Sequence, residues 1–243
     1  MLKEIRKHVR EFNESLSFVT GDFAIRQIFQ TSPRDHRQKA PVLIMRIDAT
    51  AFLFQGMTYK LSSEVRDKLA KRQFGRHYWK LVALDKSNPY RICPSQKTRL
   101  SSTFQKTVDA LEDSLIEAGH EGKSRRFPTF VSKLLHVSFP NGFPIRDALS
   151  LNAMVVVAKK ESFSDYLTRS HLGQDYDGVI EFFLQLRRRL QKSYGNDITK
   201  ELERFDYDSQ RLGKDLKVRN TWLRVIDKWL WLKGKKHMQG KRA

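Results

Sequence analysis

The stretch RFPTFVSKLLHVSFPNGFPIRD, residues 126–147, places one lysine among apolar residues and ends on an aspartate. Partial burial beside residues such as Phe130 and Leu134 would lower the pKa of the Lys133 amine, because burial disfavours the charged form, and a neutral amine is a nucleophile. Asp147 could serve that amine if the intervening chain turns back. Two ordinary alternatives stand beside this chemistry: Lys133 as a solvent-facing helix residue, and Asp147 as the N-cap of a helix over ALSLNAMVVV.

The elements that position these two residues are predicted to be mostly helices, because apolar residues recur at three- and four-residue steps along much of the chain. Serine N-caps and glycine stops support two of them, one over 61–75 and one that begins at Ser101 or Ser102 and stops at Gly119. Further helices are expected over 2–18, 175–195 and 218–234.

One segment near the N-terminus predicts a different element. APVLIMRIDATAFLFQ, residues 40–55, is rich in β-branched and aromatic residues and favours a short strand or hairpin, although a buried helix fits its pattern too. Residues 75–98 are expected to be irregular, and residues 233–243 to form a basic flexible tail. The predicted fold is therefore mainly α with a minor β element, organised as 1–100 packed on a core of 101–232, followed by the tail.

Charge is the strongest property of the whole chain: 46 Lys and Arg against 27 Asp and Glu give a formal net charge of +19 over 243 residues. Such an excess favours a polyanionic partner, most often nucleic acid, since each neutralised phosphate releases counterions. A membrane surface is the competing partner, but no segment approaches about 18 consecutive apolar residues, and the N-terminus lacks a signal-peptide apolar core. The single cysteine, Cys93, excludes an intramolecular disulfide and a multi-cysteine zinc site, so a cytoplasmic protein without a metal or other cofactor is expected.

The stretch 126–147 resembles helix-hairpin-helix DNA glycosylases, the superfamily with the 8-oxoguanine DNA glycosylase-like fold. Phe127 and Pro128 are similar to the apolar-proline entry of the family's hairpin, Lys133 stands at the position of its lysine, and FPIRD is similar to the motif that ends in its catalytic aspartate. VIDKWLWLKGK, residues 225–235, also resembles uncharacterised proteins grouped with that fold. Two features depart from the family: residues 129–131 lack the hairpin glycines, and Lys133 and Asp147 are only 14 residues apart.

The resemblance implies a helix-hairpin-helix glycosylase-like helical core and base excision from double-stranded DNA. Lys133 would attack C1′ of a flipped-out nucleotide and form a Schiff base, and Asp147 would stabilise the positive charge that develops there. The same resemblance implies nucleic-acid contacts around the hairpin, from Arg125, Arg126, Thr129 and Ser132.

Two more basic segments are expected to contact nucleic acid. RQFGRHYWK, residues 72–80, interleaves basic and aromatic side chains, which favours phosphate contact with base stacking; its alternative is a loop whose Tyr78 and Trp79 pack inward. The cluster LRRRLQK suits phosphate contact or a solvated face. The expected contacts are Arg72, Arg76, His77, Trp79, Lys80, Arg187 and Arg188.

Two other functions stay open at this point. The absent hairpin glycines favour a non-catalytic nucleic-acid-binding protein that keeps the fold. HEGK, residues 120–123, contains a Glu-x-Lys similar to a metal-dependent nuclease core, which together with the charge suggests a nuclease or toxin acting on nucleic acid. The tryptophans of the last helix are expected in the core, with base stacking as the alternative.

Overall fold

The structure is a computed structural model that describes residues 1–53, 62–119, 127–163, 167–168, 172, 175–208 and 221–240. Within these ranges the chain is mainly helical and contains no strand. None of the helices in these ranges is both long enough and apolar enough to cross a bilayer. The elements are α1 (Leu2–Glu14), α2 (Leu16–Gln30), α3 (Lys39–Leu53), α4 (Ser63–Lys71), α5 (Gln73–Ser87), the 3-10 turn η1 (Pro94–Gln96), α6 (Lys97–Glu117), α7 (Phe127–Ser138), α8 (Ala148–Lys160), α10 (Tyr176–Tyr194), α11 (Ile198–Asp208) and α12 (Trp222–Gly240).

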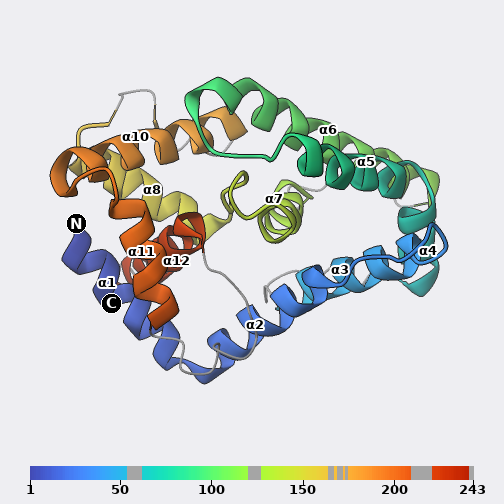
Figure 1. The fold of residues 1–243 in the computed structure, drawn as a ribbon, viewed down its shortest axis with the longest axis horizontal. Coiled ribbons are helices and arrows are strands. Elements are labelled where there is room, and N and C mark those ends of the chain that lie inside the picture. The colour runs from blue at the N-terminus through green and yellow to red at the C-terminus, as the bar shows by residue number, and fades with distance from the viewer. Residues whose placement is uncertain are drawn as a thin grey trace.

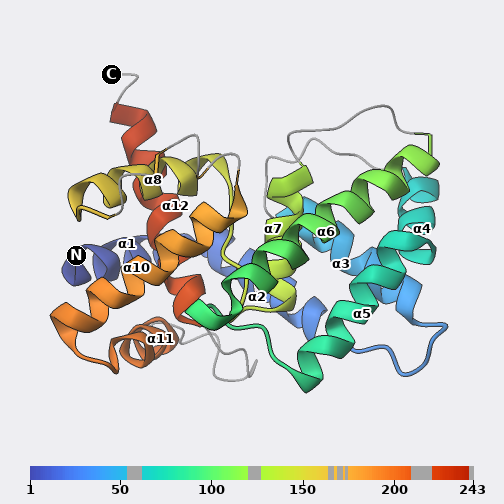
Figure 2. The ribbon, with the colours of Figure 1, turned by 90° about the horizontal axis from the view of Figure 1, so that it is seen from above.

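The helices form two groups that meet around α7 (Figure 1). One group holds α3 to α7, and the other holds α1, α8, α10, α11 and α12; α2 runs between them, as the view from above also shows (Figure 2). The contact of α6 with α10 joins the groups on a second side. The loop that leaves α7 leads directly into α8, so the chain crosses from one group to the other at residues 139–147.

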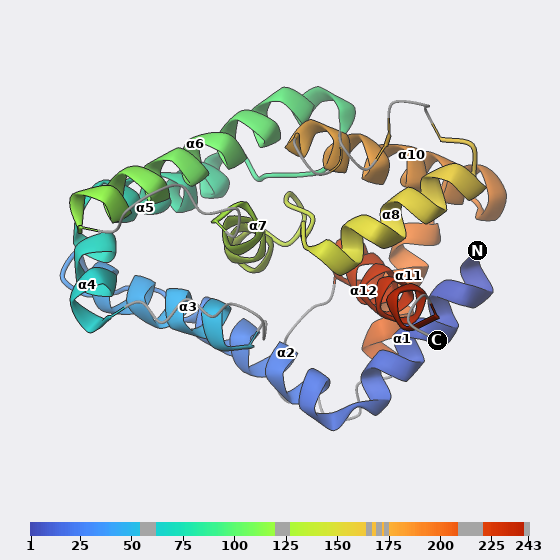
Figure 3. The same cartoon turned by 180° about the vertical axis from the view of Figure 1, so that it is seen from behind.

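In the second group, the first and last helices of the described chain, α1 and α12, pack against each other. The apolar stripe of α1, made by Ile5, Val9 and Phe12, is buried, as a one-sided helix pattern requires, and α1 packs against α12 (Figure 3). On its other side α12 lies very close to α8. A Cβ built on Gly234 would lie 2.1 Å from the carbonyl oxygen of Leu149, so only glycine allows this approach.

Two predicted elements are wrong. Over residues 40–55 the sequence favours a strand or hairpin, with a buried helix as the alternative, and the structure has the helix: residues 40–53 belong to α3, which packs against α2, α4 and α7, and residues 54 and 55 lie outside the described ranges. A helix covered on several sides shows the continuous apolar run that also suits a buried strand. Residues 75–87, expected to be irregular, belong to helix α5. The helix break instead falls at Arg72, and Gly75 is required because a Cβ there would lie 1.9 Å from the carbonyl oxygen of Ala70.

The packing also departs from the expected organisation of the chain. Helix α6 begins at Lys97, with Gln96 as its N-cap rather than Ser101 or Ser102, so it runs through the expected division at residue 100. Residues 233–240, expected as a flexible tail, continue α12. Lys233 and Lys236 of this last part form ion pairs with Glu4 and Glu11 of α1.

Candidate active site

The loop after α7 turns back along the helix that it leaves. The N–H of Gly142 donates to the carbonyl oxygen of Phe139 at 2.9 Å and closes the turn. One turn earlier on α7, the Nδ1 atom of His136 lies 2.7 Å from the carbonyl oxygen of Phe143; since a carbonyl only accepts, Nδ1 holds the proton. One turn earlier still, the N–H of Arg146 donates to the hydroxyl of Ser132 at 3.0 Å.

Neighbouring elements hold the outer side of the same loop. The Tyr176 hydroxyl donates to the carbonyl oxygen of Pro144 at 2.7 Å, and the Thr221 hydroxyl donates to that of Pro140 at 2.9 Å. Gly142 lies against Tyr90 so closely that a Cβ would approach the Tyr90 Cβ to 2.6 Å. The loop therefore has one defined path, which ends at the first residue of α8.

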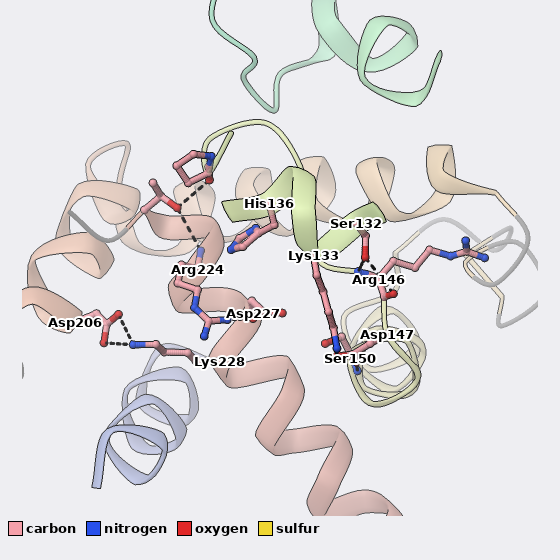
Figure 4. A network of polar contacts seen from close by, with 12 residues as sticks. Ser132, Lys133, His136, Arg146, Asp147, Ser150, Asp206, Arg224, Asp227 and Lys228 are labelled. Atoms are coloured by element: carbon pink, nitrogen blue, oxygen red, sulfur yellow. Dashed lines mark hydrogen bonds and ion pairs between the residues drawn. The ribbon is translucent and has the colours of Figure 1, made fainter. Parts of the chain in front are cut away.

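This path brings Lys133 and Asp147 together (Figure 4). The Lys133 Nζ atom lies 3.9 Å from Asp147 Oδ2, and their side chains are 9% and 14% exposed. The other carboxylate oxygen, Oδ1, accepts the N–H of Ser150 at 2.8 Å, so Asp147 is also the N-cap of α8. Both predictions for Asp147 are thus compatible: one oxygen caps the helix and the other faces the amine.

Burial is the main influence on the Lys133 amine. It lowers the pKa of Lys133, because the charged form loses water; Asp147 and then Asp227 oppose this shift by attracting the ammonium, and Arg224 adds to it by repulsion. The burial of Lys133 in α7 excludes its interpretation as a solvent-facing helix residue. A lysine with a lowered pKa is a neutral amine over a wider pH range, which is the form that attacks an electrophilic carbon.

The nearby charges of α12 were not anticipated. Arg224 and Asp227 are buried, at 7% and 5% exposure, and form an ion pair with each other. The sequence does contain a signal for them, since TWLRVIDKWLWL places charges in a helix that is apolar on every side, and such charges require partners. What it could not show is that the pair lies beside Lys133.

The hairpin contacts implied for Thr129 and Ser132 are not supported by their positions. Residues 129–131 lie inside the first turns of α7, where Phe130 and Val131 are buried, rather than in a turn before a helix. Ser132 is fully buried; its hydroxyl donates to the carbonyl oxygen of Thr129 at 2.8 Å and accepts from Arg146. Its role is to hold the loop, and Thr129 is half-buried.

The basic residues predicted in 72–80 lie on or next to helix α5. Arg72, Arg76 and Lys80 are exposed and follow one another at four-residue steps, which places them on one face of the helix. His77 is half-buried and lies 3.0 Å from the Thr107 hydroxyl; burial, then Lys80 and Lys106, lower its pKa. Trp79 is also half-buried, and Arg46 lies 5.4 Å from the centre of its ring, so it packs against the protein.

The other predicted residues are divided between α10, α12 and segments outside the described ranges. Arg188 is exposed on α10, and Arg187 is half-buried with a contact to the carbonyl oxygen of Ile92 at 3.4 Å. Trp222 and Trp229 of α12 are in the core. Arg125, Arg126 and the HEGK segment lie outside the residues that the structure describes. Within those residues, no group of three or more His, Cys, Asp or Glu side chains is arranged to hold a metal ion.

In comparisons with known proteins, no family model, no curated protein and no solved structure matches the chain.

Proposed function

We propose that this protein binds DNA and excises a base, with Lys133 as the nucleophile and Asp147 as its carboxylate partner, as in the helix-hairpin-helix DNA glycosylases that residues 126–147 resemble. The observation that supports this most directly is the buried approach of the Lys133 amine to the Asp147 carboxylate at 3.9 Å. This separation is an ion-pair distance that lies outside the ordinary hydrogen-bond range.

The chemistry assigns one role to each group. The lone pair of the neutral Lys133 amine forms a bond to C1′ of a flipped-out nucleotide, while the bond from C1′ to the base breaks and its electron pair leaves with the base. The amine loses one proton after it attacks C1′, and the departing base takes up one proton, so this step involves no net gain or loss of protons. Asp147 stabilises the positive charge that develops at C1′. The C1′–O4′ bond of the sugar then breaks, its electron pair stays with O4′, which takes up a proton from water, and the nitrogen lone pair forms the C=N bond of the protonated Schiff base. This Schiff base allows strand cleavage by elimination.

The charge of the protein supports a nucleic acid as the substrate. A formal net charge of +19 attracts phosphates, and the exposed face of α5 offers the cations of Arg76 and Lys80, with Arg72 beside them at the N-cap in an ion pair with Glu117. If α5 contacts the DNA backbone, Arg76→Ala or Lys80→Ala will weaken binding similarly for all sequences. Each will also reduce the slope of log affinity against log salt by about one.

Borohydride trapping tests the proposed chemistry. Duplexes that each contain one damaged or modified base are incubated with the protein and borohydride, which reduces an imine to a stable amine and leaves a covalent adduct. We expect an adduct with the wild type and with Lys159→Gln, which removes an exposed lysine of α8. No adduct is expected with Lys133→Gln, although its DNA binding remains. Asp147→Asn is expected to slow trapping on the order of 10²-fold.

Other results would separate the two rival functions. Salt-sensitive DNA binding without any adduct across a broad lesion panel would identify a non-catalytic nucleic-acid-binding protein. Metal-dependent cleavage that survives Lys133→Ala would identify a nuclease, and would direct attention to HEGK.

A further inference from the structure

Helix α12 holds three buried charges in an apolar setting. Arg224, Asp227 and Lys228 are 7%, 5% and 1% exposed. Burial of a charge costs free energy that a well-packed apolar residue would not, and replacement of a buried ion pair by apolar residues is often neutral or stabilising. Because these buried charges in α12 cost free energy, a specific function for each of them would explain their presence.

The role of Lys228 is structural. Its amine contacts both carboxylate oxygens of Asp206, at 2.9 and 3.1 Å, and the side-chain oxygen of Asn13 at 3.1 Å. These contacts join α12 to α11 and α1. Arg224 and Asp227 form an ion pair within α12, three positions apart.

The Arg224–Asp227 pair faces the candidate active site. In Figure 4, Lys133 extends from α7, and the Asp227 carboxyl group points from α12 toward it, with Arg224 on the far side of Asp227. Among the described residues, the charged groups that act on the Lys133 amine are Asp147 at the start of α8 and Asp227 and Arg224 on α12. The described parts of α2, α3 and α6, which also pack on α7, add no charge that acts on it.

We propose that Asp227, held by Arg224, is a positioning residue that orients the Lys133 amine and controls how readily it loses its proton. This inference rests on the proposed function, in which Lys133 attacks as a neutral amine. Asp147 from α8 and Asp227 from α12 both attract the ammonium form of Lys133, and Arg224 opposes this attraction by repulsion, so that the ammonium form is not favoured too strongly.

The two members of the pair act on Lys133 with opposite signs, which gives the proposal a sharp test. Asp227→Asn removes an attraction and leaves the repulsion of Arg224, so the neutral amine of Lys133 will persist to lower pH. Arg224→Gln removes the repulsion, so Lys133 will stay protonated to higher pH. A pair too distant to act on the Lys133 amine would not produce opposite shifts. The double variant is expected to lie between the two.

The measurement is the rate at which an amine-acylating reagent labels Lys133 as a function of pH, read by peptide mass spectrometry on the full chain. We expect the midpoint to move down by about one pH unit in Asp227→Asn and up by a similar amount in Arg224→Gln, where one unit is roughly a tenfold change in labelling rate below the midpoint. Asp197→Asn, which breaks the exposed three-residue-spaced pair with Lys200, is the matched control and should leave the midpoint unchanged.

Asp227→Glu covers the case in which the neutral variants do not fold. It keeps the charge but lengthens the side chain by one methylene, so we expect a small shift of the labelling midpoint and a several-fold loss of borohydride trapping. An identical midpoint for Lys133 in the wild type and every folded variant of the pair would overturn the proposal. Labelling needs neither DNA nor activity. Opposite shifts without any trapped adduct would therefore retain the positioning role and reject base excision alone.

Discussion

Ser132 and Arg146 lie 14 residues apart and are joined by the hydrogen bond from the Arg146 N–H to the Ser132 hydroxyl. Their following residues, Lys133 and Asp147, lie side by side for the same reason. Hydrogen bonds with Ser132 and His136 of α7, and with the carbonyl oxygen of Phe139 just after that helix, fix the returning chain. A short interval therefore suffices, because the loop folds back on the helix instead of forming a separate hairpin.

Removal of the Ser132 hydroxyl will test this anchoring. Ser132→Ala leaves the Arg146 N–H without its acceptor in a part-buried position, which is expected to cost about 1–3 kcal/mol of unfolding free energy and to slow trapping at Lys133. Urea unfolding and borohydride trapping measure the two effects. Ser87→Ala is the matched control, because the Ser87 hydroxyl donates to Leu84 at an exposed helix end. Full stability in Ser132→Ala would contradict the anchoring role.

The two oxygens of Asp147 can be separated by substitution. Asn caps a helix about as well as Asp, so Asp147→Asn should keep the stability of α8 and lose the charge that faces Lys133. Asp147→Ala also removes the cap and should cost about 1 kcal/mol of unfolding free energy. Thermal unfolding of both variants distinguishes the cap from the charge. Equal destabilisation by Asn and Ala would mean that the ion pair, rather than the cap, stabilises the fold.

Gly234 provides a test of how tightly α12 must approach α8. Gly234→Ala places a Cβ against the Leu149 carbonyl oxygen, two residues after Asp147, so the helices must move apart. We expect a loss of about 1–3 kcal/mol in unfolding free energy. Gly240→Ala in the same helix meets nothing within 4 Å and should change stability little. A normal unfolding midpoint in Gly234→Ala would show that the approach is not required.

The buried pair of Lys228 and Asp206 should behave as a unit. Lys228→Met removes the cation that lies 2.9 Å from the fully buried Asp206 carboxylate, which is expected to cost about 3–5 kcal/mol of unfolding free energy. Addition of Asp206→Leu should recover much of that loss. Urea unfolding of both single variants and the double variant gives the coupling energy. Additive losses would show that the two side chains do not interact.

His8 is expected to reduce stability at mildly acidic pH. It is 8% exposed, and burial followed by Lys236 lowers its pKa below 6.5, against the opposing effects of Glu11 and Glu4. As pH falls from 6.5 toward this lowered pKa, the unfolded chain binds a proton that the folded protein resists, so folding stability decreases. Urea unfolding from pH 7 to pH 5 should therefore show a smaller decrease in His8→Gln than in the wild type. The exposed His237→Gln is the control.

The sequence predicts the helical class well, because helices follow local patterns. Asp175 and Gly195, for example, bound α10 as expected. The type of element formed by residues 40–53 is not determined by their pattern, because an apolar run does not distinguish a helix covered on several sides from a strand. The sequence singles out Lys133 and Asp147 by residue type, but their approach to 3.9 Å depends on the path of the loop between them. The position of Arg224 and Asp227 beside Lys133 could not be predicted, because it depends on how α12 packs against α8, and no local pattern specifies a contact between segments so far apart.

The pairing of α1 with α12 has a consequence for the order of folding. Glu4 and Lys233, which join these helices, are separated by 229 residues. During synthesis α1 leaves the ribosome long before its partner exists, whereas α3 to α7 find their neighbours within one continuous stretch of chain. Until α12 emerges, α1 and α8 lack the helix that packs against both of them, and Lys133 has no charges from α12 beside it. A ribosome stalled before residue 222 would therefore hold a nascent chain with the first helix group able to form and the candidate active site still incomplete.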